Sequence, residues 1–280
     1  ICGDAKLVAQ GILAHLSPSA GNAGRDDRKA LIHTTRSKWL QTLSSMDHED
    51  DDPGTTWNAD ARKRDADRMS PRQAWRAIQA GLPKNAIISS DIGNNCAIGN
   101  AYPTFDKGRK YLAPGLFGPC GYGFPSIIGA KIGNPDTPCI GFAGDGAFGI
   151  SMNEMSSIGR EEWPGVTMVV FRNYQWGAEK RNSILWFDDN FVGTELDPHL
   201  SYAKVAEACG LKGVVVKTPT ELTEALRQSC EAQKKRVTTF IEVVLNQELG
   251  EPFRRDAMKK PVVVAGIRRE DMRPQQAANL

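Results

Sequence analysis

The stretch from Pro138 to Gly177 constrains the fold of this chain more than any other. It contains two short apolar runs, Cys139–Ala143 and Val166–Phe171, whose length and composition are typical of buried strands. A glycine-rich turn and a helical stretch, expected over 151–160, separate the two runs. This order predicts a βαβ unit with parallel strands and a right-handed crossover. Open α/β sheets bind ligands at the carboxyl ends of such strands, so the residues after each run are site candidates.

Two kinds of site fit these residues. Gly144, Gly146 and Gly149 satisfy the G-x-G-x-x-G spacing of a dinucleotide-binding turn. However, Asp145 lies within this turn and would repel a bare pyrophosphate, and the second strand leads into Asn173 instead of the acidic residue that holds a ribose. A divalent metal removes the first difficulty, because Mg²⁺ joins carboxylate oxygens to substrate phosphates. We therefore favour a metal-bridged diphosphate site over a dinucleotide site or a purely structural turn.

The metal would take oxygen ligands from Asp145, Asn173 and a backbone carbonyl just beyond. This Gly-Asp-Gly sequence, a spacer and the asparagine resemble the metal-diphosphate motif of thiamine-diphosphate (ThDP) enzymes. Longer segments, spread over nearly the whole chain, resemble the sulfoacetaldehyde acetyltransferase family: SSDIGNNCAIGNAY, APGLFGPCGYGFPSIIGAK, FRNYQWGAEKRN, DDNFVGTEL and LNQELGEPFRRDAMKKPVV. Members of that family carry a pyrimidine-binding domain and a central domain ahead of this region. The resemblance thus implies the C-terminal half of a longer enzyme.

The resemblance also implies roles for individual residues. The implied ligands of Mg²⁺ are Asp145, Asn173 and the carbonyl of Gln175. The implied diphosphate ligands are Asn94, Asn95, Gly146 and Ala147. Main-chain groups near Gly118 and Cys120 would bond the aminopyrimidine ring, and the Cys120 side chain would support the V shape of the cofactor. The remaining cofactor-binding candidates are Gly144, Phe148, Ile150 and Gln175.

The alternation of apolar runs and helical stretches predicts an α/β fold with a doubly wound, six-stranded parallel sheet. Besides the two runs above, strands are expected over 86–90, 110–113, 213–217 and 238–245. Capping boxes are expected at Ser70 and Thr218. Three segments are expected: the end of a central α/β domain with a polar linker (1–68), the diphosphate- and Mg²⁺-binding domain (69–247) and a C-terminal tail (248–280). The first segment should contain two helices with apolar stripes.

The composition is ordinary for a globular domain, with 40% hydrophobic and 24% charged residues and a net charge of +2. This charge does not favour a nucleic-acid or membrane partner. Six cysteines without a C-x-x-C pair favour reduced thiols in a cytoplasmic protein. The partners that the resemblance implies are the small molecules sulfoacetaldehyde and phosphate, an N-terminal pyrimidine-binding domain, and further copies in a homodimer or homotetramer.

The reaction implied by the resemblance converts sulfoacetaldehyde and phosphate into acetyl phosphate and sulfite, with ThDP and Mg²⁺ as cofactors. It is a step in the use of organosulfonates such as taurine. Lys180 and Arg181 follow the metal asparagine by one short loop and are candidate ligands for the anionic substrates, although a solvated charged loop would read the same way. Two alternatives stay open: another ThDP enzyme, such as an acetolactate synthase or a 2-oxo-acid decarboxylase, and a non-catalytic half-domain. The chain alone is expected to be inactive.

Overall fold

The computed structural model describes residues 3–17, 24–45, 56–105, 108, 110–160, 162–187, 192–249, 263–264 and 267–268. The chain divides into two compact units, residues 1–50 and 51–280. In the first unit, α1 (Ala5–His15) and α2 (Arg25–Ser45) are the two helices expected there. Leu13 and Ile32 in their apolar stripes each have 67% of their surface in contact with solvent, whereas Leu43 in α2 is buried.

The second unit contains the predicted six-stranded sheet. Its strands are β1 (Ile87–Ser90), β2 (Tyr111–Leu112), β3 (Cys139–Gly144), β4 (Thr167–Arg172), β5 (Lys212–Val216) and β6 (Thr239–Val244). Every neighbouring pair is parallel, in the order β2-β1-β3-β4-β6-β5. The prediction of fold class is confirmed. A separate antiparallel pair, β7 (Val263–Val264) and β8 (Ile267–Arg268), lies in the segment that we interpreted as a tail.

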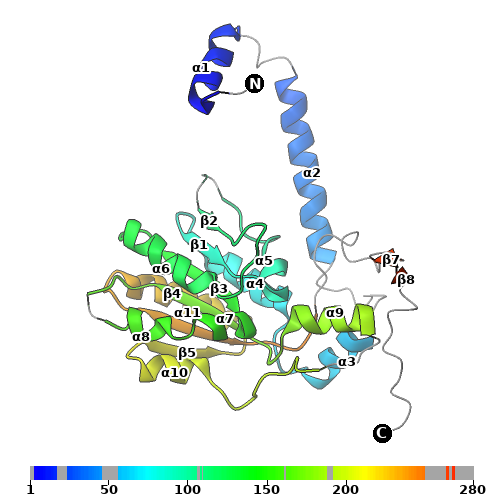
Figure 1. Ribbon diagram of the computed structural model, residues 1–280, viewed down its shortest axis with the longest axis vertical. Helices are drawn as coiled ribbons and strands as arrows, with labels where there is room; N and C mark the ends of the chain where they lie inside the picture. Colours follow the sequence, from blue (N-terminus) through cyan, green and yellow to red (C-terminus); the bar gives the residue numbers. More distant parts are fainter. Residues whose placement is uncertain are drawn as a thin grey trace. The chain divides into compact units, whose positions relative to one another are not determined.

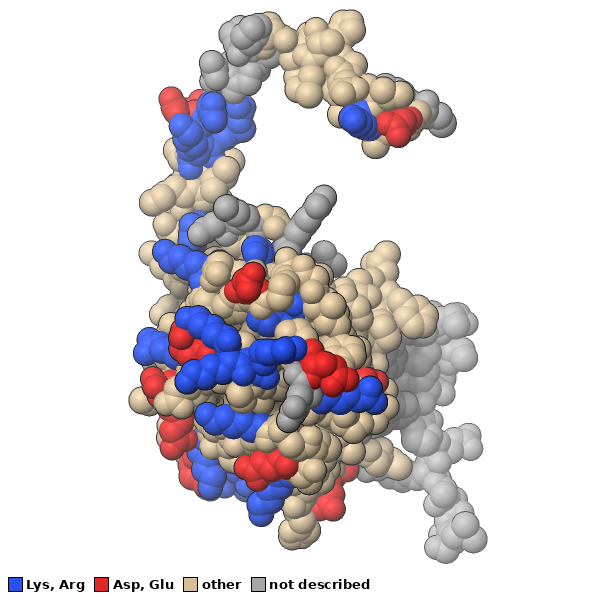
Figure 2. Space-filling view, turned by 90° about the vertical axis from the view of Figure 1, so that its left-hand side faces the viewer, with Lys and Arg blue, Asp and Glu red and all other residues tan. Residues whose placement is uncertain are grey.

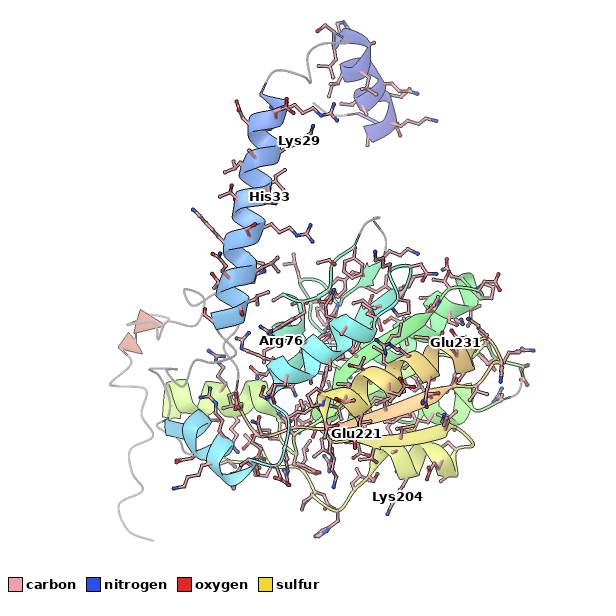
Figure 3. The ribbon with its side chains drawn as sticks, turned by 180° about the vertical axis from the view of Figure 1, so that it is seen from behind. Lys29, His33, Arg76, Lys204, Glu221 and Glu231 are labelled. Atoms are coloured by element: carbon pink, nitrogen blue, oxygen red, sulfur yellow. The ribbon has the colours of Figure 1, made fainter. Side chains whose placement is uncertain are left out.

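Helices cover both faces of this sheet, as a doubly wound fold requires (Figure 1). One face carries α4 (Pro71–Gly81), α5 (Asn94–Gly99) and α11 (Pro219–Gln233), and Figure 3 shows α4 and α11 side by side in front of the strands. The other face carries α6 (Gly123–Gly133), α7 (Asp145–Ser151), α8 (Glu154–Ile158) and α10 (Tyr202–Ala208). The predicted capping boxes at Ser70 and Thr218 are both formed.

Two details differ from the expectations. The helical stretch expected over 151–160 is formed by α8, and a separate helix, α7, already begins at Asp145, because Gly144 is extended (φ −74°, ψ 157°) and is the N-cap of α7. The polar passage interpreted as a linker contains α3 (Thr56–Arg64), and Asp65 just after it is buried against Arg64. The acidic cluster at 48–52 lies outside the described residues.

Charges of both signs are mixed on one face of the molecule. Figure 2 shows Lys and Arg side chains interleaved with Asp and Glu over the face in view, which is the pattern of an ordinary solvated surface. Within the part of the chain that the structure describes, no helix has the length and apolar character needed to cross a bilayer.

Candidate functional site

The candidate site lies where three adjacent strands end. Asn94 follows β1, Asp145 follows β3 and Asn173 follows β4. The strand register aligns these ends, since Ser90 pairs with Phe142, two residues before the end of β3, and Gly144 pairs with Phe171. The chain leaves β1 into α5 on one face and leaves β3 into α7 on the other, so the two ends form a topological switch point (Figure 1).

A cavity of about 220 Å³ occupies this switch point. Most of the residues singled out in the sequence line it: Asn94, Asn95, Gly118, Cys120, Gly144, Asp145, Gly146, Ala147, Asn173 and Gln175. They come from α5, the glycine-rich loop, α7 and the segment after β4, which are distant in sequence. Their convergence follows from the parallel sheet, which places all these strand ends at one edge.

Four other predicted residues are not among those that line the cavity. Phe148 is fully buried in the core, where its ring lies 4.9 Å from that of Phe240. Ile150 is 57% exposed. Lys180 is buried and donates to Glu195, and Arg181 donates to a backbone carbonyl at 3.5 Å. Burial lowers the pKa of Lys180, while the carboxylate of Glu195 acts in the opposite direction.

Asp145 is buried at the N-terminus of α7 and faces the cavity. Its Oδ2 accepts hydrogen bonds from Arg172 Nη1 (3.1 Å) and from the backbone N–H of Tyr174 (2.7 Å). Its Oδ1 accepts from the N–H of Gly146 (2.9 Å). Burial raises the pKa of the Asp145 carboxyl to about 6, against the opposing effects of Arg172 and these N–H groups. The site thus holds a carboxylate with little contact to water.

Sequence reasoning did not assign a role to Arg172, the last residue of β4. The only signal was an arginine that closes an otherwise apolar strand just before the asparagine. In the structure its guanidinium lies 4.3 Å from the centre of the Tyr174 ring. Tyr174 adopts a left-handed backbone (φ 61°), which is uncommon for a residue other than glycine, and its N–H donates to Asp145.

The segment after Tyr174 presents a backbone carbonyl as well. Gln175 forms an antiparallel bridge with Glu195, and the hydrogen bonds on either side run from Trp176 N to Thr194 O and from Leu196 N to Tyr174 O. In such a pair the intervening N–H and C=O point away from the partner strand. The carbonyl of Gln175 therefore accepts no hydrogen bond in this pairing.

The cavity wall holds buried polar atoms that no described residue satisfies. Asn94 Nδ2, Asn95 Oδ1, Asn173 Nδ2 and Gln175 Oε1 are all buried without a hydrogen-bond partner among the described residues. Buried polar groups in folded proteins are normally paired. Four orphaned amide atoms around one cavity fit a polar ligand: amide nitrogens can donate to phosphate oxygens, and the oxygens can bind a metal or a donor.

A second missed residue, Asp91, holds the glycine-rich loop in place. Its carboxylate accepts from the N–H groups of Ile92 (2.8 Å), Gly121 (3.1 Å) and Gly123 (2.7 Å). Burial raises the pKa of Asp91, and the three N–H donors oppose that shift. Asp91 thus ties the end of β1 to the loop that carries Gly118 and Cys120 along the cavity.

The geometry also bears on the dinucleotide alternative. In that fingerprint the third glycine permits close packing of the helix on the strand. Here the corresponding residue is Gly149, and a Cβ added to it would meet only the hydroxyl of Tyr202, at 3.8 Å. Since this is an ordinary van der Waals contact, the fold does not require glycine at 149, and the dinucleotide interpretation loses its structural basis.

Comparisons with known proteins agree with the geometry. Residues 91–243 match the family described as "Thiamine pyrophosphate enzyme, C-terminal TPP binding domain". The chain is 77% identical to a "Probable sulfoacetaldehyde acetyltransferase" of Rhizobium meliloti (strain 1021), over 99% of this chain and 47% of that protein. It is 72% identical to a "Sulfoacetaldehyde acetyltransferase" of Roseovarius nubinhibens, over 99% of this chain and 46% of that protein.

Similarity of fold extends to a solved structure, the thiamine diphosphate-dependent 4-hydroxybenzoylformate decarboxylase of Rhodococcus jostii RHA1. The TM-score is 0.59 at 24% identity, and the match covers 65% of this chain and 34% of that one. The chain spans about half the length of the curated relatives that it matches. From the family match and the cavity at the switch point we conclude that the chain belongs to the thiamine pyrophosphate enzymes and carries their C-terminal TPP-binding domain.

Proposed function

We propose that this chain is the C-terminal half of a ThDP- and Mg²⁺-dependent sulfoacetaldehyde acetyltransferase. The reaction would convert sulfoacetaldehyde and phosphate into acetyl phosphate and sulfite, in the cytoplasmic degradation of organosulfonates such as taurine. The observation that carries the proposal is 77% identity to the Rhizobium meliloti protein across 99% of the chain. The cavity supports it, because its lining is suited to a diphosphate held through a metal.

Charge in the cavity favours the metal. Among the described residues that line the cavity, the two charged ones are both acidic, Asp145 and Glu179. These would repel a diphosphate unless a divalent cation lay between them and the phosphates. Asp145, the amide oxygen of Asn173 and the carbonyl of Gln175 form an all-oxygen ligand set, which suits Mg²⁺. The amides of Asn94 and Asn95 would then donate to the diphosphate.

The rest of the lining would position the cofactor and exclude water. The loop held by Asp91 offers backbone groups near Gly118 and the half-buried thiol of Cys120. The indole of Trp176 forms an apolar wall, and a dry site strengthens electrostatic interactions within it. ThDP supplies, when bound, an electron sink that stabilises a carbanion.

Lys180 and Arg181 remain our candidates for binding the sulfonate or the phosphate. The ammonium of Lys180 is paired with Glu195, whose side chain is 57% exposed. Glu195 also accepts from Gln247 Nε2 at 3.1 Å, so its carboxylate gives up two bonds when it turns into solvent. An incoming anion would replace Glu195 as the partner of Lys180 and so keep the buried ammonium paired. The active assembly would be a homodimer or homotetramer, each subunit having an N-terminal pyrimidine-binding domain.

The test uses a fusion, the joined protein, in which the N-terminal half of the Rhizobium meliloti relative precedes this chain. Sulfite release is measured with sulfoacetaldehyde, ThDP and Mg²⁺, with and without phosphate, in the joined protein and in its Asp145→Ala variant. We expect phosphate-dependent sulfite release that requires Mg²⁺ and is abolished by Asp145→Ala. A calorimetric titration with ThDP should show the same dependence on Mg²⁺ and on Asp145.

The same assay separates the alternatives. An acetolactate synthase or a 2-oxo-acid decarboxylase would consume pyruvate or another 2-oxo acid and release no sulfite. A non-catalytic half-domain would bind ThDP without turnover even in the joined protein. Either result would refute the proposed reaction.

A further inference from the structure

Arg172 is a buried cation directly behind the cavity. It ends β4, and none of its side chain is exposed to solvent. Its Nη1 donates to Asp145 Oδ2 at 3.1 Å. On the far side its Nε lies 3.8 Å from the carboxylate of Glu242 on β6. The guanidinium therefore stands between two buried carboxylates, one of which lines the cavity.

The guanidinium itself is held firmly. Its Nη2 donates to the backbone carbonyls of Asp197 and Leu200, the latter at 3.1 Å. The rings of Tyr174 and Tyr202 lie 4.3 and 5.2 Å from its central carbon. The guanidinium is planar and its N–H donors point in fixed directions, so it loses little conformational freedom when it binds. The two carbonyls and the two rings hold it in one orientation relative to Asp145.

Counting acceptor sites on Asp145 shows what this arrangement leaves open. An ionised carboxylate has about four lone-pair sites, two on each oxygen. Both sites on Oδ2 are taken, by Arg172 and by the N–H of Tyr174. Among the residues that the structure describes, Oδ1 accepts only from the N–H of Gly146. The one site that these bonds leave is on Oδ1, and Asp145 lines the cavity.

We propose that Arg172 is a positioning residue, which locks the Asp145 carboxylate so that Oδ1 alone is presented to a divalent cation in the cavity. This inference rests on the Mg²⁺-diphosphate site of the proposed function and adds to it a residue outside the ligand set. The simpler reading is that the pair only stabilises the fold. The two hypotheses make different predictions for the affinity of the site for Mg²⁺ in a variant that still folds.

The test is Arg172→Lys in the joined protein. Lysine keeps the positive charge beside Asp145 but lacks the fork that reaches both the carboxylate and the 197–200 carbonyls, so charge is held constant while orientation is lost. ThDP binding is followed by tryptophan fluorescence as Mg²⁺ is titrated. We expect the Mg²⁺ concentration at half-saturation to rise roughly 10- to 100-fold, the usual effect of losing a partner of a metal ligand. Saturating Mg²⁺ should restore the full binding signal.

The matched control is Arg227→Lys on α11, an exposed arginine, which should leave the Mg²⁺ dependence unchanged. An unchanged half-saturation in Arg172→Lys would overturn the inference. So would a reduced maximum signal that excess Mg²⁺ does not restore, because that is the behaviour of a purely structural role. If the wild type itself binds ThDP without any need for Mg²⁺, the proposed function fails first, and the inference with it.

A second variant covers the case in which Arg172→Lys does not fold. The double variant Arg172→Met with Glu242→Gln removes the cation together with one of the two carboxylates that face it. Asp145 would keep its N–H donors but lose the fork. We expect a similar increase in the Mg²⁺ requirement, and an unchanged requirement would again overturn the inference.

Discussion

Gly146 lies so close to Trp176 that a Cβ at position 146 would stand 2.9 Å from Cδ2 of the indole. Real Cβ atoms do not approach other atoms this closely, so glycine is required here by packing. Both residues line the cavity, Gly146 from the first turn of α7 and Trp176 from the segment after β4. The contact sets the separation of the two segments that supply the candidate metal ligands.

Gly146→Ala should therefore weaken cofactor binding and the fold together. The indole must move, and overpacking of this kind costs about 1–3 kcal/mol. Urea unfolding measures the loss of stability, and tryptophan emission reports the displacement. The control is Gly149→Ala in the same helix, where a Cβ meets only the Tyr202 hydroxyl at 3.8 Å. That variant should be neutral, or more stable by roughly 0.5–1 kcal/mol; a loss as large as that of Gly146→Ala would contradict the packing argument.

A second prediction concerns pH in the absence of Mg²⁺ and ThDP. The pKa of Asp145 is raised by burial to about 6 in the folded chain, from an ordinary value of 3.8. The folded state then binds the proton more tightly than the unfolded state, so this group's contribution to stability is full below pH 4 and is lost as the pH rises to about 6. At 1.36 kcal/mol per pKa unit the loss is about 2–4 kcal/mol.

Measuring the free energy of unfolding of wild type and of Asp145→Asn at several pH values isolates the contribution of Asp145 ionisation to stability. The wild type should lose stability relative to the variant between pH 4 and 6, and the difference should level off above pH 6. A difference that is flat across this range would show that Asp145 titrates normally. Adding Mg²⁺ and ThDP should reduce the slope, because a metal favours the ionised carboxylate.

A third prediction tests Lys180. A charge-assisted hydrogen bond contributes about 1.5–3 kcal/mol, so Lys180→Ala should raise KM by roughly 10- to 150-fold for either sulfoacetaldehyde or phosphate. Glu195→Gln removes the competing anion and should lower the same KM or leave it unchanged. If Lys180→Ala lowers the melting temperature without changing either KM, the residue has only the structural role that its burial and its pairing with Glu195 suggest.

The fold was predictable because the apolar runs are short and bounded by glycine or polar residues. The strands begin and end within one residue of the expected positions. The convergence of Asp145 and Asn173 followed from parallel topology alone. The start of α7 was missed because Gly-Asp-Gly reads as a turn, whereas Gly144 continues the strand and caps the helix.

Other features depend on tertiary partners that a sequence does not display. The arginine at the end of β4 could as well have faced solvent; its role appears only when the strand order brings Asp145 and Glu242 to either side of it. Lys180 follows Asn173 closely in sequence, yet its ammonium pairs with Glu195. In α1 and α2 the apolar stripes were visible, but the sequence could not show that Leu13 and Ile32 would be exposed while Leu43 is buried.

The last prediction is that the 280-residue chain does not turn over by itself. The chain spans about half of its curated relatives, and the proposed function requires an N-terminal pyrimidine-binding domain. Next to the cavity, Leu116 and Phe117 are almost wholly exposed in the loop that leads to Gly118. Apolar side chains of this size in solvent are typical of a surface that packs against another domain.

Sulfite release is therefore compared between the chain alone and the joined protein, under identical concentrations of ThDP, Mg²⁺, sulfoacetaldehyde and phosphate. We expect turnover only in the joined protein, together with weak ThDP binding and self-association of the chain alone in size-exclusion chromatography. Replacing both Leu116 and Phe117 by serine should reduce that self-association and also lower the activity of the joined protein, because the same side chains would pack against the N-terminal half. Comparable sulfite release from the chain alone would refute the dependence on a second half, since the switch-point cavity would then suffice for catalysis.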